Sequence, residues 1–207
     1  PVLPVRPPMT AYHYSGGGAT ILQLALTDVL GKPYPDILRE SVLEPVGMTQ
    51  STFDQPLPPE RDNNAARAHD REGKGMGDKW HIHPELAAAG LWTTPTDLAK
   101  FAIEVQKSLR GEANNVISQT MIKEMLSPVG IGDFAVGFSV TRQGQGWYFS
   151  HGGANWGFIC LLKAHKVKGY GFAIMTNAQS GGILVNELEE RIERAYGYDS
   201  LDKSILR

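Results

Sequence analysis

The sequence predicts an α+β fold, in which a helical region precedes an antiparallel sheet that a last helix closes. Two observations favour this class. Apolar residues recur at helical spacing in several segments before residue 130. Apolar runs separated by short glycine-containing turns then follow, and an amphipathic pattern comes last. We therefore divide residues 1–207, as a single domain, into a mainly helical region at 12–130 and a sheet with its closing helix at 131–198.

The composition excludes several functional classes. An apolar content of 42% and a charged content of 20% are ordinary for a globular protein. The net charge of −2 and the absence of a basic run give no signal for nucleic acid or for a membrane surface. No apolar run approaches the roughly 20 residues that a membrane-spanning helix needs. Cys160 is the single cysteine, so no intrachain disulfide forms, and we expect its side chain to be packed within a strand.

The first two helices are indicated by apolar spacing. The glycines at 16–18 should form a tight turn, and a helix should follow and end at Gly31 and Pro33. Its apolar face comprises Ile21, Leu22, Ala25, Leu26 and Val29. A second helix should cover Tyr34 to Leu43 and stop at Pro45 and Gly47.

The middle of the chain combines a loop with two further helices. Residues 53–79 are polar and rich in proline and glycine, which indicates a long loop; loops of this length are usually functional. Thr94 has the features of an N-cap for the next helix, with Pro95 at the first helical position and Asp97 in the first turn. A shorter helix should cover residues 118–126, with Met121, Ile122 and Met125 buried.

The last third of the sequence changes to strand patterns. Turns at 142–144 and 166–169 fit antiparallel neighbours. The four strand candidates cover residues 134–140, 146–149, 158–165 and 170–176. A final helix follows Gly181 and Gly182, and it should cover one face of the sheet with an apolar stripe. We place Ile183, Leu184, Leu188, Ile192 and Ala195 on that stripe, and Glu187, Glu189, Glu190 and Arg191 on the solvent side.

Two stretches carry groups that suit chemistry. In residues 149–158, His151 stands beside Gly152, Gly153 and Ala154, which together leave a bare backbone that a ligand can approach closely. A glycine-rich hairpin turn with a surface histidine is the alternative interpretation. The second stretch is Tyr14-Ser15-Gly16-Gly17-Gly18, which is no phosphate loop because no Gly-Lys-Ser/Thr follows.

A metal site is not expected. His81 and His83 would point the same way on a strand, but zinc needs three or four ligands and no cluster of Cys, Asp or Glu completes the set. We therefore expect neither a metal nor another cofactor.

The two stretches together resemble the serine β-lactamases and penicillin-binding proteins, especially the class C-like esterases and the D-aminopeptidases. This family carries Ser-x-x-Lys, then Tyr-x-Asn or Ser-x-Asn, then Lys-Thr-Gly on a strand. Tyr14-Ser15-Gly16 is similar to the second motif and His151-Gly152-Gly153 to a known His-x-Gly variant of the third. Residues 44–48, 89–91, 94–98 and 175–177 look like further family landmarks, in the same order, so that the resemblance extends from about Tyr12 to Tyr196.

The resemblance implies roles for the site residues. Tyr14 would be the proton shuttle, and His151 would be the polar group of the strand. The backbone N–H of Ala154 would be one oxyanion donor. Gly152, Gly153 and Asn155 would line the strand edge along which the substrate lies. Gly16 departs from the family because many relatives have Asn there, and this amide would contact both the lysine and the substrate.

The nucleophile is absent from its expected place. The Ser-x-x-Lys segment should precede Tyr14, but the first thirteen residues contain neither Ser nor Lys. One such string, Ser200-Leu201-Asp202-Lys203, follows the last helix, where the family would not place it. We therefore expect a partial domain that is inactive alone and is completed by an N-terminal portion of the same protein, in the same or in a separate chain.

The complete protein would transfer an acyl group from a small-molecule substrate, which is an ester, a β-lactam or a short peptide amide. The resemblance also implies a periplasmic or secreted location. A non-catalytic remnant that serves as a binding or assembly module is the alternative.

Overall fold

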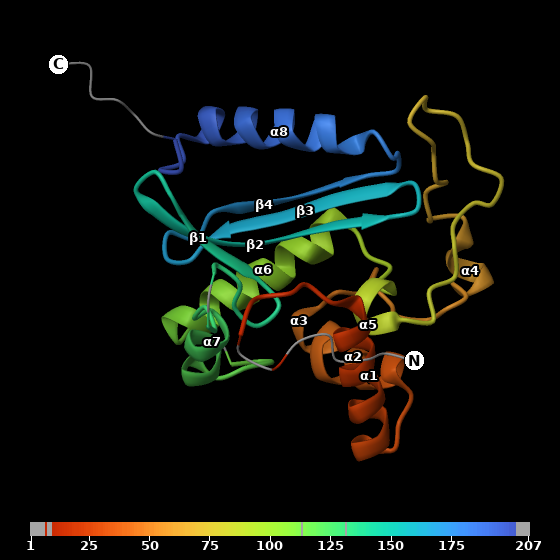
Figure 1. Ribbon diagram of the computed structural model, residues 1–207, viewed down its shortest axis with the longest axis horizontal. Coiled ribbons are helices and arrows are strands. Elements are labelled where there is room, and N and C mark those ends of the chain that lie inside the picture. The colour runs from red at the N-terminus through yellow and green to blue at the C-terminus, as the bar shows by residue number, and fades with distance from the viewer. Residues whose placement is uncertain (1–6, 8–9, 113, 131, 202–207) are drawn as a thin grey trace.

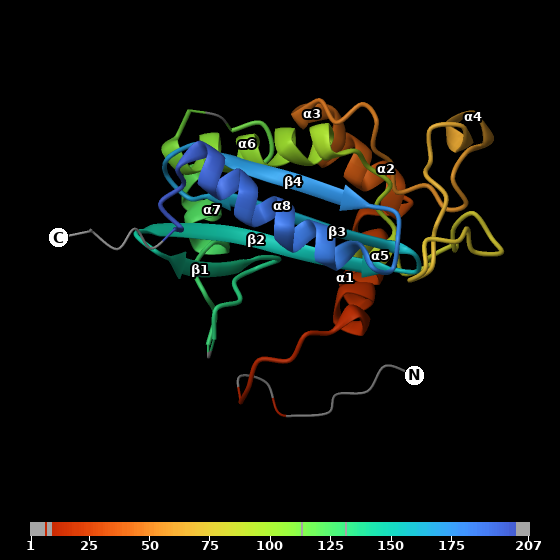
Figure 2. The ribbon, with the colours of Figure 1, turned by 90° about the horizontal axis from the view of Figure 1, so that it is seen from above.

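The computed structural model describes residues 7, 10–112, 114–130 and 132–201 of the chain. In these residues a four-stranded antiparallel sheet, in the order β1-β2-β3-β4, lies between helical layers (Figure 1). Helix α8 covers one face of the sheet, and α6 packs against β3 and β4 from the other face (Figures 1 and 2). The predicted α+β class, with a sheet closed by the last helix, is confirmed.

The sheet is a meander of hairpins. Its strands are β1 (Ser139–Gln143), β2 (Gly146–Asn155), β3 (Phe158–His165) and β4 (Gly171–Thr176). The predicted strand at 134–140 was misplaced, since residues 134–138 form a loop that bends at Gly137 with φ of 79°. The predicted turn at 142–144 was also misplaced, because Arg142 lies within β1 and the turn begins at Gly144 with φ of 55°.

The main core lies between the sheet and two helices, α6 (Pro95–Arg110) and α7 (Gln119–Met125). Its buried members are Ala102, Val105, Ile122, Leu126, Phe138, Val140, Phe149, Leu162 and Ala164. Thr94 caps α6 as predicted, because its Oγ1 accepts from the Asp97 N–H at 3.2 Å. The expectation for Met121 was wrong: its side chain is 60% exposed, whereas Ile122 turns fully into the core.

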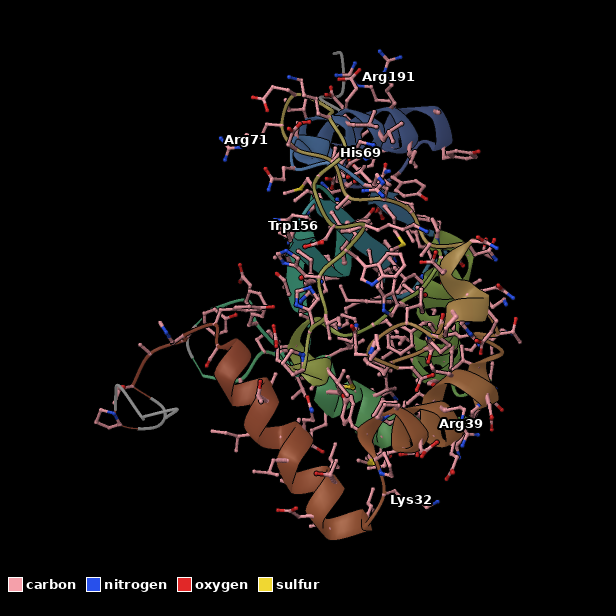
Figure 3. The ribbon with its side chains drawn as sticks, turned by 90° about the vertical axis from the view of Figure 1, so that its right-hand side faces the viewer. Lys32, Arg39, His69, Arg71, Trp156 and Arg191 are labelled. Atoms are coloured by element: carbon pink, nitrogen blue, oxygen red, sulfur yellow. The ribbon has the colours of Figure 1, made fainter. Side chains whose placement is uncertain are left out.

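Helix α1 (Gly16–Leu30) begins inside the glycine run. The Ser15 hydroxyl accepts from the Gly18 N–H at 3.0 Å and so caps the first turn, which corrects the expectation that these glycines form a turn before the helix. Gly31, with φ of 62°, ends the helix. Figure 3 shows α1 extending away from the sheet. Its exposed apolar side chains are Ile21, Leu22, Leu24, Val29 and Leu30.

The second predicted helix continues further than expected. It comprises α2 (Tyr34–Leu38), a π-helical turn η1 (Arg39–Leu43) and α3 (Glu44–Val46), and it passes through Pro45. Gly47, with φ of 75°, ends it. The following residues 53–79 form the predicted long loop, interrupted by a single turn α4 (Pro59–Asp62), and α5 (Leu86–Ala89) follows the loop.

Helix α8 (Gly181–Tyr196) is anchored by charge as well as by apolar contact. Lys163 of β3 is 2% exposed, and its Nζ lies 2.5 Å from Glu193 and 2.8 Å from Glu189. The prediction for this helix was therefore wrong in part. Glu189 faces the sheet, whereas Ile183 is 78% exposed.

The residues after α8 return to the sheet. Asp199 accepts hydrogen bonds from the hydroxyls of Tyr148 (2.5 Å) and Tyr170 (2.7 Å), and it pairs with Lys168 (2.7 Å). Burial raises the pKa of Asp199, but the Lys168 ammonium and the two tyrosine hydroxyls together hold it well below the usual range. Ser200 lies in this region, beside Tyr148, while Asp202 and Lys203 lie outside the described residues.

None of the helices in the described ranges is long and apolar enough to cross a membrane.

Candidate active site

Tyr14 and His151, separated by 137 residues, meet in the fold. The Tyr14 hydroxyl oxygen lies 3.3 Å from Nε2 of His151. Tyr14 belongs to the irregular segment just before the Ser15 cap, and it is 61% exposed. His151 lies on β2, on the same face as the buried Phe149. The pair therefore stands at the solvent-accessible border between the helical region and the sheet.

The glycine-rich stretch is a strand and not a turn. Strand β2 continues through Asn155, which pairs with Phe158, and the hairpin turn consists of Trp156 and Gly157. Gly157 adopts the φ of 74° that this turn requires. The alternative interpretation of residues 151–155 as a hairpin turn is therefore wrong.

Among the residues that the structure describes, no strand pairs with one edge of β2 beyond Ser150, and we call this its open edge. Strand β1 begins only at Ser139, opposite Ser150, while β3 pairs with β2 as far as Asn155. Asn155 closes the hairpin, so it exchanges hydrogen bonds with β3, and every second residue of β2 does the same. The residues between them, Gly152 and Ala154, direct their backbone groups to the open edge. The Ala154 N–H thus points to this edge of β2 and away from β3.

The two glycines differ in their packing. A Cβ atom on Gly153 would lie 2.7 Å from Sγ of Cys160, so a side chain there would displace the cysteine. A Cβ atom on Gly152 would find its nearest neighbour, the Cys160 carbonyl oxygen, at an ordinary 3.7 Å. The packing against Cys160 within the sheet therefore already favours a residue without a side chain at position 153. Burial raises the pKa of the Cys160 thiol, which agrees with a packing role for this residue.

The hairpin that follows is held by two contacts. The Asn155 side-chain amide donates to the Ala89 carbonyl at 3.0 Å, so that α5 holds the end of β2. The Trp156 ring stacks on His81, which follows the long loop, at 3.8 Å and with 14° between the planes. Figure 3 shows Trp156 beside the sheet. The Asn155 amide nitrogen is therefore used in a contact within the fold.

A shallow pocket adjoins this hairpin through His81. Its volume is about 530 Å³, and it is lined by Asp62, Asp78, Lys79, Trp80, His81 and Ile82. The sequence did not reveal it, since residues 53–82 have no periodicity that would place their side chains.

His81 and His83, the two histidines considered as metal ligands, follow the long loop. The His81 and His83 rings are 6.4 Å apart, and Nδ1 of His83 lies 3.2 Å from a carboxylate oxygen of Glu85. Across the residues that the structure describes, no group of three or more His, Cys, Asp or Glu side chains is placed to hold a metal ion.

The family model described as Beta-lactamase matches residues 2–196. No curated protein matches the sequence.

Among solved structures, the chain is similar to SurE, with a TM-score of 0.76 and 25% identity over 94% of this chain and 47% of that one. It is similar to the octameric penicillin-binding protein homologue from Pyrococcus abyssi, with a TM-score of 0.73 and 20% identity over 95% of this chain and 45% of that one. It is also similar to D-amino acid amidase from Ochrobactrum anthropi SV3, with a TM-score of 0.72 and 22% identity over 92% of this chain and 60% of that one. The chain thus spans between 45% and 60% of the length of these three structures.

Proposed function

Because the chain belongs to the β-lactamase family, we propose that it forms part of a serine hydrolase that works by acyl transfer. The observation that carries the proposal is the approach of Tyr14 to His151, 3.3 Å apart, beside the open edge of β2. A serine nucleophile needs a group that takes its proton, and the oxyanion needs fixed N–H donors. Tyr14 and His151 would take the proton of the serine. The Ala154 N–H would be one of the donors to the oxyanion.

We propose that the nucleophile comes from an N-terminal portion of the same protein. The chain spans only 47% of SurE and 60% of the amidase, so much of a complete domain of this kind lies outside the match. The exposed apolar side chains of α1 support a missing neighbour, because such a surface is rarely left to water. This chain alone would then be inactive.

The substrate would be an ester, a β-lactam or a short peptide amide. The amide is our first choice, because the similar structures include a D-amino acid amidase complexed with D-phenylalanine. By family membership, we also propose a periplasmic or secreted location.

Covalent labelling tests the proposed function. A fluorophosphonate or a fluorescent penicillin should label the complete protein, and an excess of unlabelled β-lactam should prevent labelling by the penicillin. The chain of residues 1–207, incubated alone, should stay unlabelled. If neither probe labels the folded complete protein, the acyl-transfer proposal is wrong, and the alternative of a non-catalytic binding or assembly module takes its place.

The exposed face of α1 predicts how this chain behaves in isolation. Leu22 is 59% and Val29 is 82% exposed, and seven residues of separation put them on one side of the helix. We expect the isolated chain to self-associate, and the double change Leu22→Ser and Val29→Ser to shift it toward monomer in analytical ultracentrifugation. Val167→Ser is the matched control, because Val167 is 68% exposed but lies in the β3–β4 turn. A monodisperse monomer before any substitution would contradict this prediction.

A further inference from the structure

The two ring nitrogens of His151 have different partners. Nδ1 lies 2.6 Å from the carbonyl oxygen of Gly137, and Nε2 lies 3.3 Å from the Tyr14 hydroxyl. A carbonyl oxygen can only accept, so Nδ1 must carry a hydrogen and donate it to Gly137. In the neutral ring Nε2 is then the acceptor, and the Tyr14 hydroxyl donates to it.

One loop holds both members of this pair. We define the Phe134 loop as residues 132–138. Its Phe134 ring stacks on Tyr12 at 4.5 Å and meets the Tyr14 ring edge-on at 6.2 Å. Gly137 has φ of 79°, a conformation that glycine adopts without strain, and its carbonyl receives the His151 hydrogen. Contacts from the same loop therefore orient the tyrosine and the histidine together.

The loop is itself fixed to the body of the protein. The Val136 N–H donates to the Met125 carbonyl at 3.0 Å, at the end of α7. The Ala135 N–H donates to the Phe138 carbonyl at 2.8 Å, and the Phe138 side chain is buried in the main core. The carbonyl that holds His151 therefore has a backbone whose position is set by the core.

We propose that the Phe134 loop holds His151 in the Nδ1–H form, so that Tyr14 and His151 act as a two-step proton relay. The proposal rests on the proposed acyl-transfer function and deepens it. As the nucleophile attacks, its hydroxyl proton passes to the Tyr14 oxygen, and the proton that Tyr14 already carries passes to Nε2. The electron pair of the broken O–H bond forms the bond to the acyl carbon, whose π pair moves to the oxyanion. Reversal of the relay delivers a proton to the leaving group.

The relay gives histidine a role that lysine cannot fill. A lysine ammonium, which the family motif has at this place, donates three hydrogens and accepts none. It can stabilise a tyrosine oxygen only as a cation. A neutral histidine with its free nitrogen toward Tyr14 instead takes the proton, so the resting site needs no tyrosinate.

Nuclear magnetic resonance tests the tautomer without any catalysis. The complete protein, with ¹⁵N-labelled histidine and at a pH above the histidine titration range, is recorded in long-range ¹H–¹⁵N correlations. His151, assigned by its loss in His151→Gln, should show a protonated Nδ1 and an unprotonated Nε2. His165 is the internal reference with the opposite form, because its Nδ1 accepts from the N–H groups of Val167 (2.9 Å) and Lys168 (2.8 Å). An Nε2–H form of His151 would overturn the proposal.

Two variants separate the contributions of the loop and the tyrosine. Tyr14→Phe should leave the hydrogen on Nδ1 and shift only the Nε2 resonance, because Gly137 still holds the ring. Phe134→Ala should also leave the hydrogen on Nδ1, since the core fixes the Gly137 carbonyl, but it should shift the Nε2 resonance because Tyr14 loses its ring contact. A mixture of the two tautomers in either variant, in a protein that is still folded, would show that the Gly137 carbonyl does not fix the form of His151.

The proton relay is tested by measuring the acylation rate in mixtures of light and heavy water. If two protons are transferred in the acylation step, the rate in the complete protein should depend on the deuterium fraction along a curve. In His151→Gln the dependence should be a straight line. A straight dependence in the unmodified protein would refute the relay even where the tautomer is as proposed. The proposed function fails by a different result, namely the absence of any labelling by serine probes.

Discussion

Replacing Tyr14 by phenylalanine in the complete protein should lower the acylation rate by about 10²–10⁴-fold, the usual contribution of a positioned acid–base group. The change removes only the hydroxyl that lies 3.3 Å from Nε2 of His151. The ring stays to meet Phe134, and since the side chain is 61% exposed, folding should be unaffected. Single-turnover acylation by a chromogenic ester or β-lactam measures the rate, and circular dichroism reports on the fold.

Tyr12→Phe is the matched control for this prediction. Tyr12 stands two residues earlier and stacks on the same Phe134 ring, but its hydroxyl makes no hydrogen bond within the described part of the chain. Its loss should leave the acylation rate close to that of the unmodified protein. Equal rates for Tyr14→Phe and the unmodified protein would show that proton transfer in this site does not pass through Tyr14.

Local sequence features were sufficient for the elements on which the site stands. The Thr94 cap with Pro95 and Asp97 is a local signal, and α6 begins where it indicates. Strand β3 was likewise predicted with its bounds, because its run of apolar residues lies between two clear turns. The juxtaposition of Tyr14 and His151 is different in kind. Nothing in spacing or periodicity connects residues 137 positions apart, and only the resemblance to a known family brought them together.

Other features depend on tertiary contacts that no local pattern records. The face of α8 was misassigned because Lys163, a charged residue in an apolar run, draws Glu189 and Glu193 toward the sheet. The hydrogen bond from His151 to Gly137 could not be predicted from the sequence, because its acceptor is a backbone carbonyl, which every residue possesses. The stacking of His81 on Trp156 joins an irregular loop to a hairpin, and irregular loops carry no period from which a neighbour can be inferred.

The buried cation of β3 leads to the largest expected effect on stability. Lys163→Ala should lower the free energy of unfolding of the complete protein by about 3–5 kcal/mol, as is usual when one partner of a buried ion pair is removed. Lys163 is 2% and Glu193 is 7% exposed, so the substitution would leave a carboxylate in the interior without its cation. It would also remove the ammonium that stands 4.9 Å from the centre of the Tyr148 ring. Denaturant unfolding followed by circular dichroism measures the change.

We expect a large loss of stability in Lys163→Ala because this ion pair is buried. An exposed ion pair on the same helix serves as the control. Arg191 and Glu187 of α8 also lie 2.5 Å apart, but their side chains are 74% and 52% exposed, and Arg191 points outward in Figure 3. Arg191→Ala should therefore cost less than about 1 kcal/mol. Equal costs for the two variants would show that Lys163 does not anchor α8 through its charge.

A third variant separates the charge from the space that it fills. Lys163→Met combined with Glu193→Leu replaces the pair by apolar groups of similar size, and such replacements are often neutral for stability. Lys163 is paired across the sheet with Ser150, the neighbour of His151. If the double variant is as stable as the unmodified protein but acylates more slowly, the buried pair serves to set the position of β2 at the site. If it is equally stable and equally fast, the pair serves only to attach α8.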